Sequence, residues 1–175
     1  MNLKDAIRTI PDFPKPGIMY RDITTLLTNR RALAEAVIQL SEPYKHKDVD
    51  NIAGIEARGF TFGTAVAYEL GAGFVPVRKK GKLPFDTFEQ DYQLEYGEDT
   101  LEIHADSIRK GENVVIIDDL IATGGTAEAT VKLIKRTGAN IIGAAFVIDL
   151  PELGGTKRLE RMGIPVTSLV KFEGH

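Results

Sequence analysis

The sequence predicts an α/β fold, in which a twisted, mostly parallel sheet is flanked by helices. Two apolar runs, residues 114–117 and 141–148, are rich in Val, Ile or Ala and are typical of parallel strands buried on both faces. Strand-like runs alternate along the chain with segments of helical periodicity. With 175 residues, 43% of them hydrophobic and 27% charged, the chain fits one globular domain spanning residues 1–175.

In the N-terminal third of the chain, the sequence predicts two helices and one strand. Residues 3–10 have the spacing of a short amphipathic helix, which the three prolines of residues 11–17 stop. Residues 30–40 carry Leu33, Val37 and Leu40 at helical spacing. The predicted strand is the short apolar run at residues 51–55.

The central third predicts a helix, a strand and a hairpin. Residues 62–70 form the helix, which Gly71 ends. In the strand at residues 74–77, a proline indicates a sheet edge or a strand start. Two alternating segments on either side of Gly97, residues 92–96 and 100–104, predict a hairpin that projects from the sheet.

The remaining elements follow in strand–helix order. The sequence predicts a buried strand at 114–117, a helix at 127–137 ended by Gly138, a buried strand at 141–148, a short helix at 156–162 and a last strand at 166–170.

Composition excludes several classes of protein. The absence of cysteine excludes disulfides, thiol catalysis and Cys-ligated metal centres. A net charge of −3 argues against nucleic acid as a partner. The longest apolar run, residues 141–148, is too short to cross a membrane, and residues 1–10 lack the apolar segment of a signal peptide. We therefore expect a cytoplasmic protein without a membrane partner.

That net charge averages over two segments of opposite sign. Residues 78–82 hold four cations in five positions. Residues 83–106 hold eight acids and no Lys or Arg. The cations suit a small, highly charged anion, whereas a solvated basic loop is the alternative interpretation of the same cluster.

The strongest candidate site follows the buried strand at 114–117. Asp118 and Asp119 end that strand, and the loop Ala122-Thr123-Gly124-Gly125-Thr126 opens a helix. Glycines let a backbone approach an anion closely, and the N–H groups of a helix N-terminus favour phosphate. The carboxylates would repel phosphate but suit sugar hydroxyls or a hydrated Mg²⁺. The pattern indicates a phosphorylated ribose; the alternative is that the acids merely cap the helix and the glycines merely form a turn.

A second candidate site is the segment at residues 54–60, another strand–loop–helix junction. It carries Arg58, whose guanidinium can hold a diphosphate through two parallel hydrogen bonds. The alternative is a surface arginine that pairs with Glu56. Neither the P-loop motif nor the G-x-G-x-x-G dinucleotide motif occurs in the chain.

The residues from 114 to 126 resemble the donor-binding motif of the type I phosphoribosyltransferases. Further motifs resemble the branch of that family that acts on adenine, in its order and spacing: Phe13-Pro14-x-Pro16-Gly17, Tyr20-Arg21-Asp22-Ile23, Arg58-Gly59-Phe60, Arg78-Lys79-x-Gly81-Lys82-Leu83-Pro84 and Leu94-Glu95-Tyr96-Gly97. The resemblance covers about residues 11–150. It implies that adenine and 5-phosphoribosyl-1-diphosphate react, with Mg²⁺, to give AMP and diphosphate.

The resemblance also implies roles for particular residues. The 5′-phosphate would bind to the loop of Ala122, Thr123, Gly124, Gly125 and Thr126, and the ribose hydroxyls to Asp118 and Asp119. The diphosphate would face Arg58, Lys79, Lys82 and Arg78, the last of these across a dimer interface. The adenine would lie between Tyr20 and Leu150, with the backbone near Met19 and Arg21 along its edge. No protein side chain is assigned as a direct ligand of Mg²⁺, which substrate oxygens and waters near Asp118 and Asp119 would hold.

The family pattern further implies a hood segment, a flexible loop and a homodimer. Residues 1–29 would form a hood segment beside the adenine, and residues 79–99 a flexible catalytic loop carrying Glu95 and Tyr96. Glu95 would manage a purine proton, together with Arg58, Lys79 and Tyr96 as catalytic groups; an outward-facing hairpin residue is the alternative for Glu95. Relatives that use 6-oxopurines have an aspartate where this chain has Ala122, which favours adenine. Transfer to another base such as xanthine, or a regulatory domain that binds the donor without catalysis, stays open.

Overall fold

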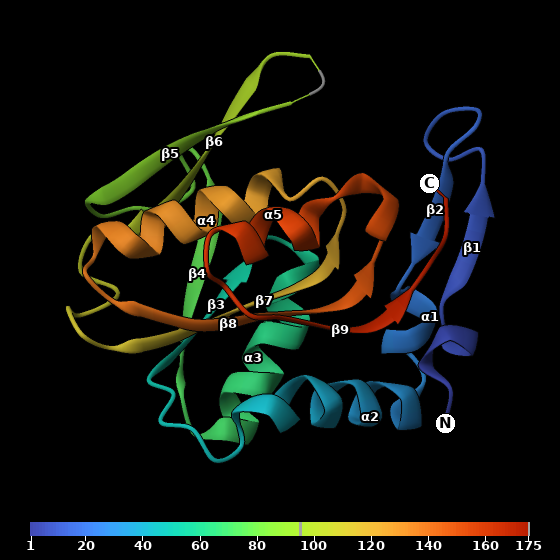
Figure 1. Ribbon diagram of the computed structural model, residues 1–175, viewed down its shortest axis with the longest axis horizontal. Helices are drawn as coiled ribbons and strands as arrows, with labels where there is room; N and C mark the ends of the chain where they lie inside the picture. Colours follow the sequence, from blue (N-terminus) through green and yellow to red (C-terminus); the bar gives the residue numbers. More distant parts are fainter. Residues whose placement is uncertain (95, 175) are drawn as a thin grey trace.

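The computed structural model describes residues 1–94 and 96–174 and is built around a seven-stranded sheet (Figure 1). The strand order is β5-β6-β4-β3-β7-β8-β9. Neighbours from β4 to β9 pair in parallel, whereas β6 pairs antiparallel to both β4 and β5. The predicted α/β class with a projecting hairpin is therefore confirmed. The strands are β3 (Asn51–Ile55), β4 (Gly73–Lys79), β5 (Thr87–Gln93), β6 (Glu98–His104), β7 (Asn113–Ile121), β8 (Asn140–Asp149) and β9 (Val166–Lys171).

The central strand β7 is covered on both faces, which explains its uninterrupted apolar run. Val114 and Ile116 belong to one hydrophobic core, on the side of helices α4 and α5. Val115 and Ile117 belong to a second core, on the side of α1, α2 and α3. Figure 1 shows these two layers above and below the sheet. The helices are α1 (Thr24–Leu27), α2 (Arg30–Ser41), α3 (Arg58–Leu70), α4 (Gly125–Arg136) and α5 (Gly155–Arg161).

Helices α2 to α5 match the predicted positions, but α3 and α4 begin two or more residues earlier than predicted. Helix α3 begins at Arg58 rather than at residue 62, and α4 at Gly125 rather than at residue 127. In both cases the first turn contains glycine and polar residues, which carry no apolar periodicity. At the other end of α3, Gly71 adopts a left-handed conformation with φ of 69°, so its prediction as the stop is confirmed.

The predicted helix at residues 3–10 is wrong beyond its first turn. A 3₁₀ helix (Leu3–Ala6) is followed by strand β1 (Arg8–Pro11), which pairs antiparallel with β2 (Met19–Asp22). The Arg8 guanidinium donates to the Asp22 carboxylate at 2.5 and 3.1 Å. Hydrogen bonds from Thr24 and Arg8 lower the pKa of Asp22 to about 2. This cross-strand ion pair has no local sequence signal, so periodicity alone favours the wrong element.

The proline of β4 is accommodated because β4 is an edge over most of its length. Although β4 lies inside the strand order, β6 pairs with it only at Arg78 and Lys79 among the described residues. The N–H of Gly73 donates to Asp50 beside β3, so by alternation the nitrogen of Pro76 faces the opposite, unpaired side. The predicted edge position is thus locally correct.

Three short elements were not predicted from periodicity: α1 and the 3₁₀ turns Glu42–Tyr44 and Pro151–Leu153. The hairpin β5–β6 and the arm β1–β2 project from the molecule on the same side in Figure 1. Across the described residues, no helix has the length and apolar character needed to span a bilayer.

Replacing Phe62 tests the core between α3 and the sheet. Phe62 is fully buried, so Phe62→Ala should lower the free energy of unfolding by about 3–5 kcal/mol. Urea unfolding measures this change. Glu69→Ala, on the exposed side of the same helix, should stay within about 0.5 kcal/mol of the unchanged protein. Equal effects of the two substitutions would contradict the assignment of Phe62 to the core.

Candidate active site

The candidate site lies where β7 ends and α4 begins. Strand β7 continues through Asp118 and Asp119 to Ile121, four residues beyond the predicted end at residue 117. It extends because β8 pairs with it as far as Ile121. Both carboxylates therefore sit on a rigid strand rather than on a loop, and a short loop then leads to Gly125, the first residue of α4.

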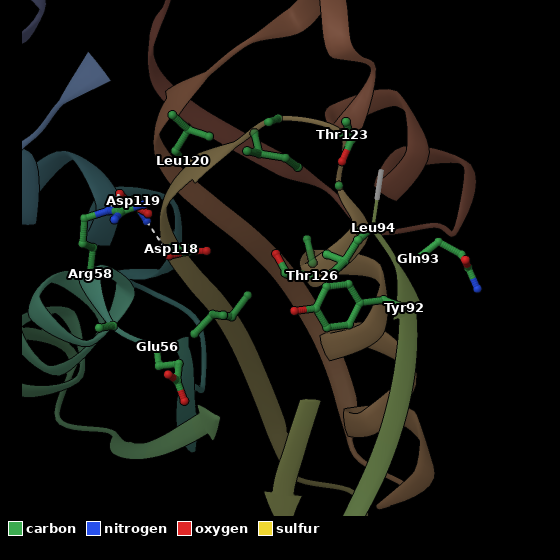
Figure 2. A pocket seen from close by; sticks show the side chains of 17 residues that line it. Glu56, Arg58, Tyr92, Gln93, Leu94, Asp118, Asp119, Leu120, Thr123 and Thr126 are labelled. Atoms are coloured by element: carbon green, nitrogen blue, oxygen red, sulfur yellow. Dashed lines mark hydrogen bonds and ion pairs between the residues drawn. The ribbon is translucent and has the colours of Figure 1, made fainter. Parts of the chain in front are cut away.

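A cavity of about 390 Å³ opens at this junction (Figure 2). One wall carries Arg58 and Asp119, and the opposite wall carries Tyr92 and Leu94 from the end of β5. The whole predicted phosphate loop, residues 122–126, lines the cavity together with Asp118. The structure thus brings together the residues predicted to bind phosphate and ribose and one of the four predicted to bind diphosphate.

The loop has the conformation of an anion-binding helix N-terminus. Gly124 precedes α4 with φ of 88°, a conformation that favours glycine. The N–H of Glu128 donates to the Gly124 carbonyl at 2.8 Å, which begins the helix ladder. Among the described residues no side chain caps α4, so the alternative in which Asp118 and Asp119 cap this helix is wrong.

Arg58 pairs with Asp119, and not with Glu56 as the alternative interpretation required. Its Nε donates to Oδ2 of Asp119 at 2.6 Å (Figure 2). The negative charge of Asp119 raises the pKa of Arg58, so the guanidinium stays charged. As the first residue of α3, Arg58 is held at the cavity wall by the helix that follows it.

Asp118 is buried beside this ion pair. Burial and the neighbouring charge of Asp119 raise the pKa of Asp118 well above its ordinary value. Its Oδ1 accepts a hydrogen bond from the Asp119 backbone N–H at 2.8 Å. Gly59 leaves the space that this carboxylate occupies, because a Cβ at Gly59 would lie 2.6 Å from Oδ1. A buried carboxylate kept this close to a second one is costly, which is typical of functional sites.

Glu56 organises the basic segment at the end of β4. Its carboxylate pairs with Lys82 at 2.5 Å and with Arg78 at 3.4 Å, and accepts from the backbone N–H of Lys79 at 2.8 Å. Burial alone would raise the pKa of Glu56, but the hydrogen bonds from Lys82 and the Lys79 backbone lower it. Because Glu56 lines the cavity, it places Arg78 and Lys82 beside the cavity wall.

The other two lysines of the segment pair with the hairpin. Lys79 contacts Asp99 at 3.5 Å, and Lys80 contacts Glu89 at 3.4 Å. A hydrogen bond from the Thr100 backbone and the charge of Lys79 lower the pKa of Asp99. These lysines are exposed to solvent but also have acidic partners on the hairpin. The acids that follow in sequence are the partners of these lysines, which lie outside the cavity lining.

A second cavity, of about 290 Å³, adjoins the first and is largely apolar. All four residues predicted for the adenine side, which are Met19, Tyr20, Arg21 and Leu150, line it. Arg58, Asp119 and Leu120 line both cavities. Arg21 directs its side chain away along the arm, since it donates to Thr9 at 2.7 Å and lies over the Phe172 ring at 4.3 Å. An ion-binding cavity and an apolar cavity therefore meet at one wall.

Several lining residues were missed by sequence reasoning. Tyr92, Gln93 and Leu94 line the first cavity from the end of β5, and Ile18, Leu120 and Leu153 line the second. Leu94 and Leu120 lie within motifs that carry the family resemblance, and these motifs were the sequence signals for this group. Tyr96 lies at the hairpin tip, 81% exposed, and is not brought to either cavity. Glu95 lies outside the described residues, so its predicted role stays a prediction.

The fold and the site define a class of enzyme that binds a phosphorylated sugar at the carboxyl end of a parallel sheet. A family model described as "Phosphoribosyl transferase domain" matches residues 22–162. The adenine phosphoribosyltransferase of Maricaulis maris is 59% identical over 99% of both chains. The chain therefore belongs to the adenine phosphoribosyltransferases, a group of pentosyl transferases within that family.

Solved structures agree with this assignment. The crystal structure of adenine phosphoribosyltransferase from Rhodothermus marinus superposes with a TM-score of 0.92, at 51% identity, covering 97% of this chain and 96% of that one. The Saccharomyces cerevisiae enzyme, complexed with D-2,5-dideoxy-2,5-imino-altritol 1,6-bisphosphate and adenine, superposes with a TM-score of 0.90, at 40% identity and 96% coverage of both chains.

Neutralising Asp118 should stabilise the protein without ligand. A raised folded-state pKa means that stability falls as pH rises from the unfolded value of about 3.9 through the folded value. Asn cannot ionise and can still accept from the Asp119 N–H, so Asp118→Asn should remove this loss. We expect its Tm at pH 7 to rise by a few degrees, since about 2–4 °C corresponds to 1 kcal/mol in a chain of this size.

Asp22→Asn is the control of opposite sign. The pKa of Asp22 is lowered to about 2, so its ionised form stabilises the fold above about pH 4, and this contribution is lost as pH falls toward 2. The Asn variant should therefore melt earlier than the unchanged protein at pH 7. Melting curves of both variants and of the unchanged protein are measured from pH 4 to 8. If Asp118→Asn had a lower Tm than the unchanged protein at pH 7, the proposed loss of stability from the ionised Asp118 carboxylate would be contradicted.

Proposed function

We propose that the protein transfers the 5-phosphoribosyl group from 5-phosphoribosyl-1-diphosphate to adenine, giving AMP and diphosphate in an Mg²⁺-dependent reaction. The observation that carries this proposal is the shared wall of Arg58, Asp119 and Leu120 between a cavity with a phosphate loop and an apolar cavity. Donor and base would bind in these two adjoining cavities, and the reacting carbon of the donor would lie where the cavities meet. Membership among the adenine phosphoribosyltransferases supports the choice of base.

The donor would bind along the first cavity. Backbone N–H groups and hydroxyls of residues 122–126 hold the 5′-phosphate, and Asp118 and Asp119 accept hydrogen bonds from the ribose hydroxyls. Arg58 faces the diphosphate, with Lys82 held beside it by Glu56. Lys79 would join them by leaving Asp99, from which it is 3.5 Å away. The loop thus fixes the 5′-phosphate end of the donor, and the cations fix its diphosphate leaving group.

Adenine would bind in the second cavity, between Tyr20 and Leu150. The Tyr20 ring offers a stacking face, and Phe13 supports it edge-on, with ring centroids 5.1 Å apart. Backbone groups at Met19 and Arg21 would contact the edge of the base, since the Arg21 side chain is engaged elsewhere. Ala122 offers no group for a 6-oxopurine, which favours adenine over hypoxanthine and guanine.

The reaction exchanges one bond for another at the anomeric carbon. The C1–oxygen bond to diphosphate breaks, leaving an oxocarbenium-like ribosyl centre, and the N9 lone pair of adenine forms the new C1–N9 bond. The purine ring then loses its proton, which Glu95 would accept. Arg58, Lys79 and Lys82 stabilise the negative charge that develops on the diphosphate, and the shared wall aligns base and sugar.

The site is compatible with Mg²⁺ that is bound chiefly through the substrate. The described residues contain no group of three or more His, Cys, Asp or Glu side chains placed to hold a metal on their own. Mg²⁺ commonly binds through one or two carboxylates, substrate phosphates and waters, and Asp118 and Asp119 supply such carboxylates. When bound, Mg²⁺ would add positive charge beside the diphosphate.

The hairpin between β5 and β6 would close over the site. Tyr92 and Leu94 already reach the cavity from this hairpin, and Tyr96 lies exposed at its tip. Closure would exclude water, which otherwise hydrolyses the donor. Closure would also bring Tyr96 and Glu95 to the bound base, where Glu95 would accept the purine proton. We further propose a cytoplasmic homodimer in which Arg78 reaches a neighbour's diphosphate; sedimentation measures the oligomeric state.

A base panel tests the proposed reaction. With Mg²⁺ and 5-phosphoribosyl-1-diphosphate, we expect nucleotide formation from adenine and little or none from hypoxanthine, guanine, xanthine or orotate. Chromatography of the products measures each rate, and a parallel series with chelator should show no turnover. Faster turnover of another base than of adenine would contradict the adenine assignment. Donor binding without any turnover would favour a regulatory domain.

Replacing Glu95 tests the proposed proton acceptor. Glu95→Gln keeps the shape of the side chain but removes its basicity, so kcat should fall by about 10²-fold. The KM for the donor should change little, because the donor lies on the loop and the cations. Steady-state kinetics with both substrates measure these constants, with Glu98→Gln, on the same hairpin, as the matched control. An unchanged kcat would reduce Glu95 to an outward-facing hairpin residue.

A further inference from the structure

The back of the phosphate loop is held by α5, a helix that contributes nothing to the cavity lining. The backbone N–H of Gly155 donates to the Ala122 carbonyl at 3.0 Å. Nη1 of Arg158 donates to the Thr123 carbonyl at 3.2 Å. The next carbonyl, that of Gly124, accepts from Glu128 in α4. Three successive carbonyls of the loop are therefore fixed by hydrogen bonds.

These three bonds decide where the N–H groups of the loop point. In a trans peptide unit the C=O and the following N–H point in opposite directions. Holding the carbonyls of Ala122, Thr123 and Gly124 at the rear therefore turns the N–H groups of Thr123, Gly124 and Gly125 toward the side on which these residues line the cavity. Two of the three donors are backbone N–H groups, those of Gly155 and Glu128. The third donor is the side chain of Arg158.

Arg158 also carries a charge that the loop needs. Its Nη2 pairs with the carboxylate of Glu128, which lies in the first turn of α4. An acid at that position opposes an incoming phosphate at the same helix end. Pairing with Arg158 offsets this negative charge and at the same time holds the guanidinium against the Thr123 carbonyl.

We propose that Arg158 is a positioning residue for donor binding, which holds the phosphate loop in its binding conformation from behind. The inference rests on the proposed function, since it assumes that the loop receives the 5′-phosphate. Arg158 touches no substrate in this arrangement and acts through the peptide unit of Thr123 and Gly124. Its effect should therefore appear only with ligands that carry the 5′-phosphate.

Arg158→Met tests this role because it keeps the aliphatic stem and removes the guanidinium. We expect the KM for 5-phosphoribosyl-1-diphosphate and the Kd for AMP to rise about tenfold, the loss of one hydrogen bond to a charged group. The KM for adenine, which reaches the other cavity, should stay unchanged. Steady-state kinetics and calorimetric titration with AMP measure these constants, and circular dichroism confirms folding.

Lys132→Met is the matched control. Lys132 also contacts Glu128, at 3.9 Å, but Arg158 alone of these two cations donates to Thr123. The control should leave the donor KM unchanged. Arg158→Lys keeps the charge but replaces the two-nitrogen fork of the guanidinium by a single nitrogen, so its donor KM should lie between those of the unchanged protein and the Met variant. This variant decides the matter if Arg158→Met does not fold.

Three results would overturn the proposal: an unchanged donor KM in folded Arg158 variants, an equal rise in the KM of both substrates, or the same loss in Lys132→Met. An equal rise would indicate general damage to the fold rather than positioning of the loop. Failure of the proposed function is distinct from all three, because the unchanged protein would then form no AMP from adenine and donor.

Discussion

The ion pair between Arg58 and Asp119 connects the parts of the site. At 2.6 Å it joins the first residue of α3 to strand β7, and both side chains line the two cavities. If either partner were absent, the other would face a partly buried cleft with an uncompensated charge. The pair thus fixes the wall across which base and sugar would meet. Gly59, next to Arg58, then leaves the room in which Asp118 packs.

The remaining cations of the site are paired with acids of the same chain. Glu56 pairs with Lys82 and Arg78, and Asp99 pairs with Lys79. A diphosphate carries several negative charges, so its binding would exchange weak partners for strong ones rather than gather free cations. This explains how a basic segment and an acidic hairpin follow each other in a chain whose net charge is only −3. Two of the four cations, Lys79 and Lys80, meet acids of that hairpin in space.

The features that could be predicted from the sequence are those that depend on neighbouring residues in the chain. The parallel core follows from apolar runs such as residues 114–117, and the phosphate loop from glycines after a strand. The arm β1–β2 was missed because its register depends on Arg8 and Asp22, fourteen residues apart, and a helical spacing of apolar residues masks it. Arg58 was expected at the site, but its ion pair with Asp119, 61 residues away, was not foreseen. The alternative interpretation paired it with Glu56, only two residues away, which is the kind of partner that sequence proximity suggests. Leu153, in the second cavity, carries no pattern at all.

The same limit applies to the phosphate loop, although its motif is contiguous. Glycine at 124 permits the positive φ, yet the loop closes only because Gly155, which has no Cβ, approaches within hydrogen-bonding distance of Ala122. A Cβ at Gly155 would lie 2.5 Å from the Ala122 oxygen, and one at Gly124 would lie 2.9 Å from the Gly155 Cα. The two segments therefore constrain each other. The contiguous loop at residues 122–126 can specify which backbone groups meet the phosphate. The direction of these groups depends on α5, a helix some thirty residues further along the chain, which packs against the loop only in the finished fold.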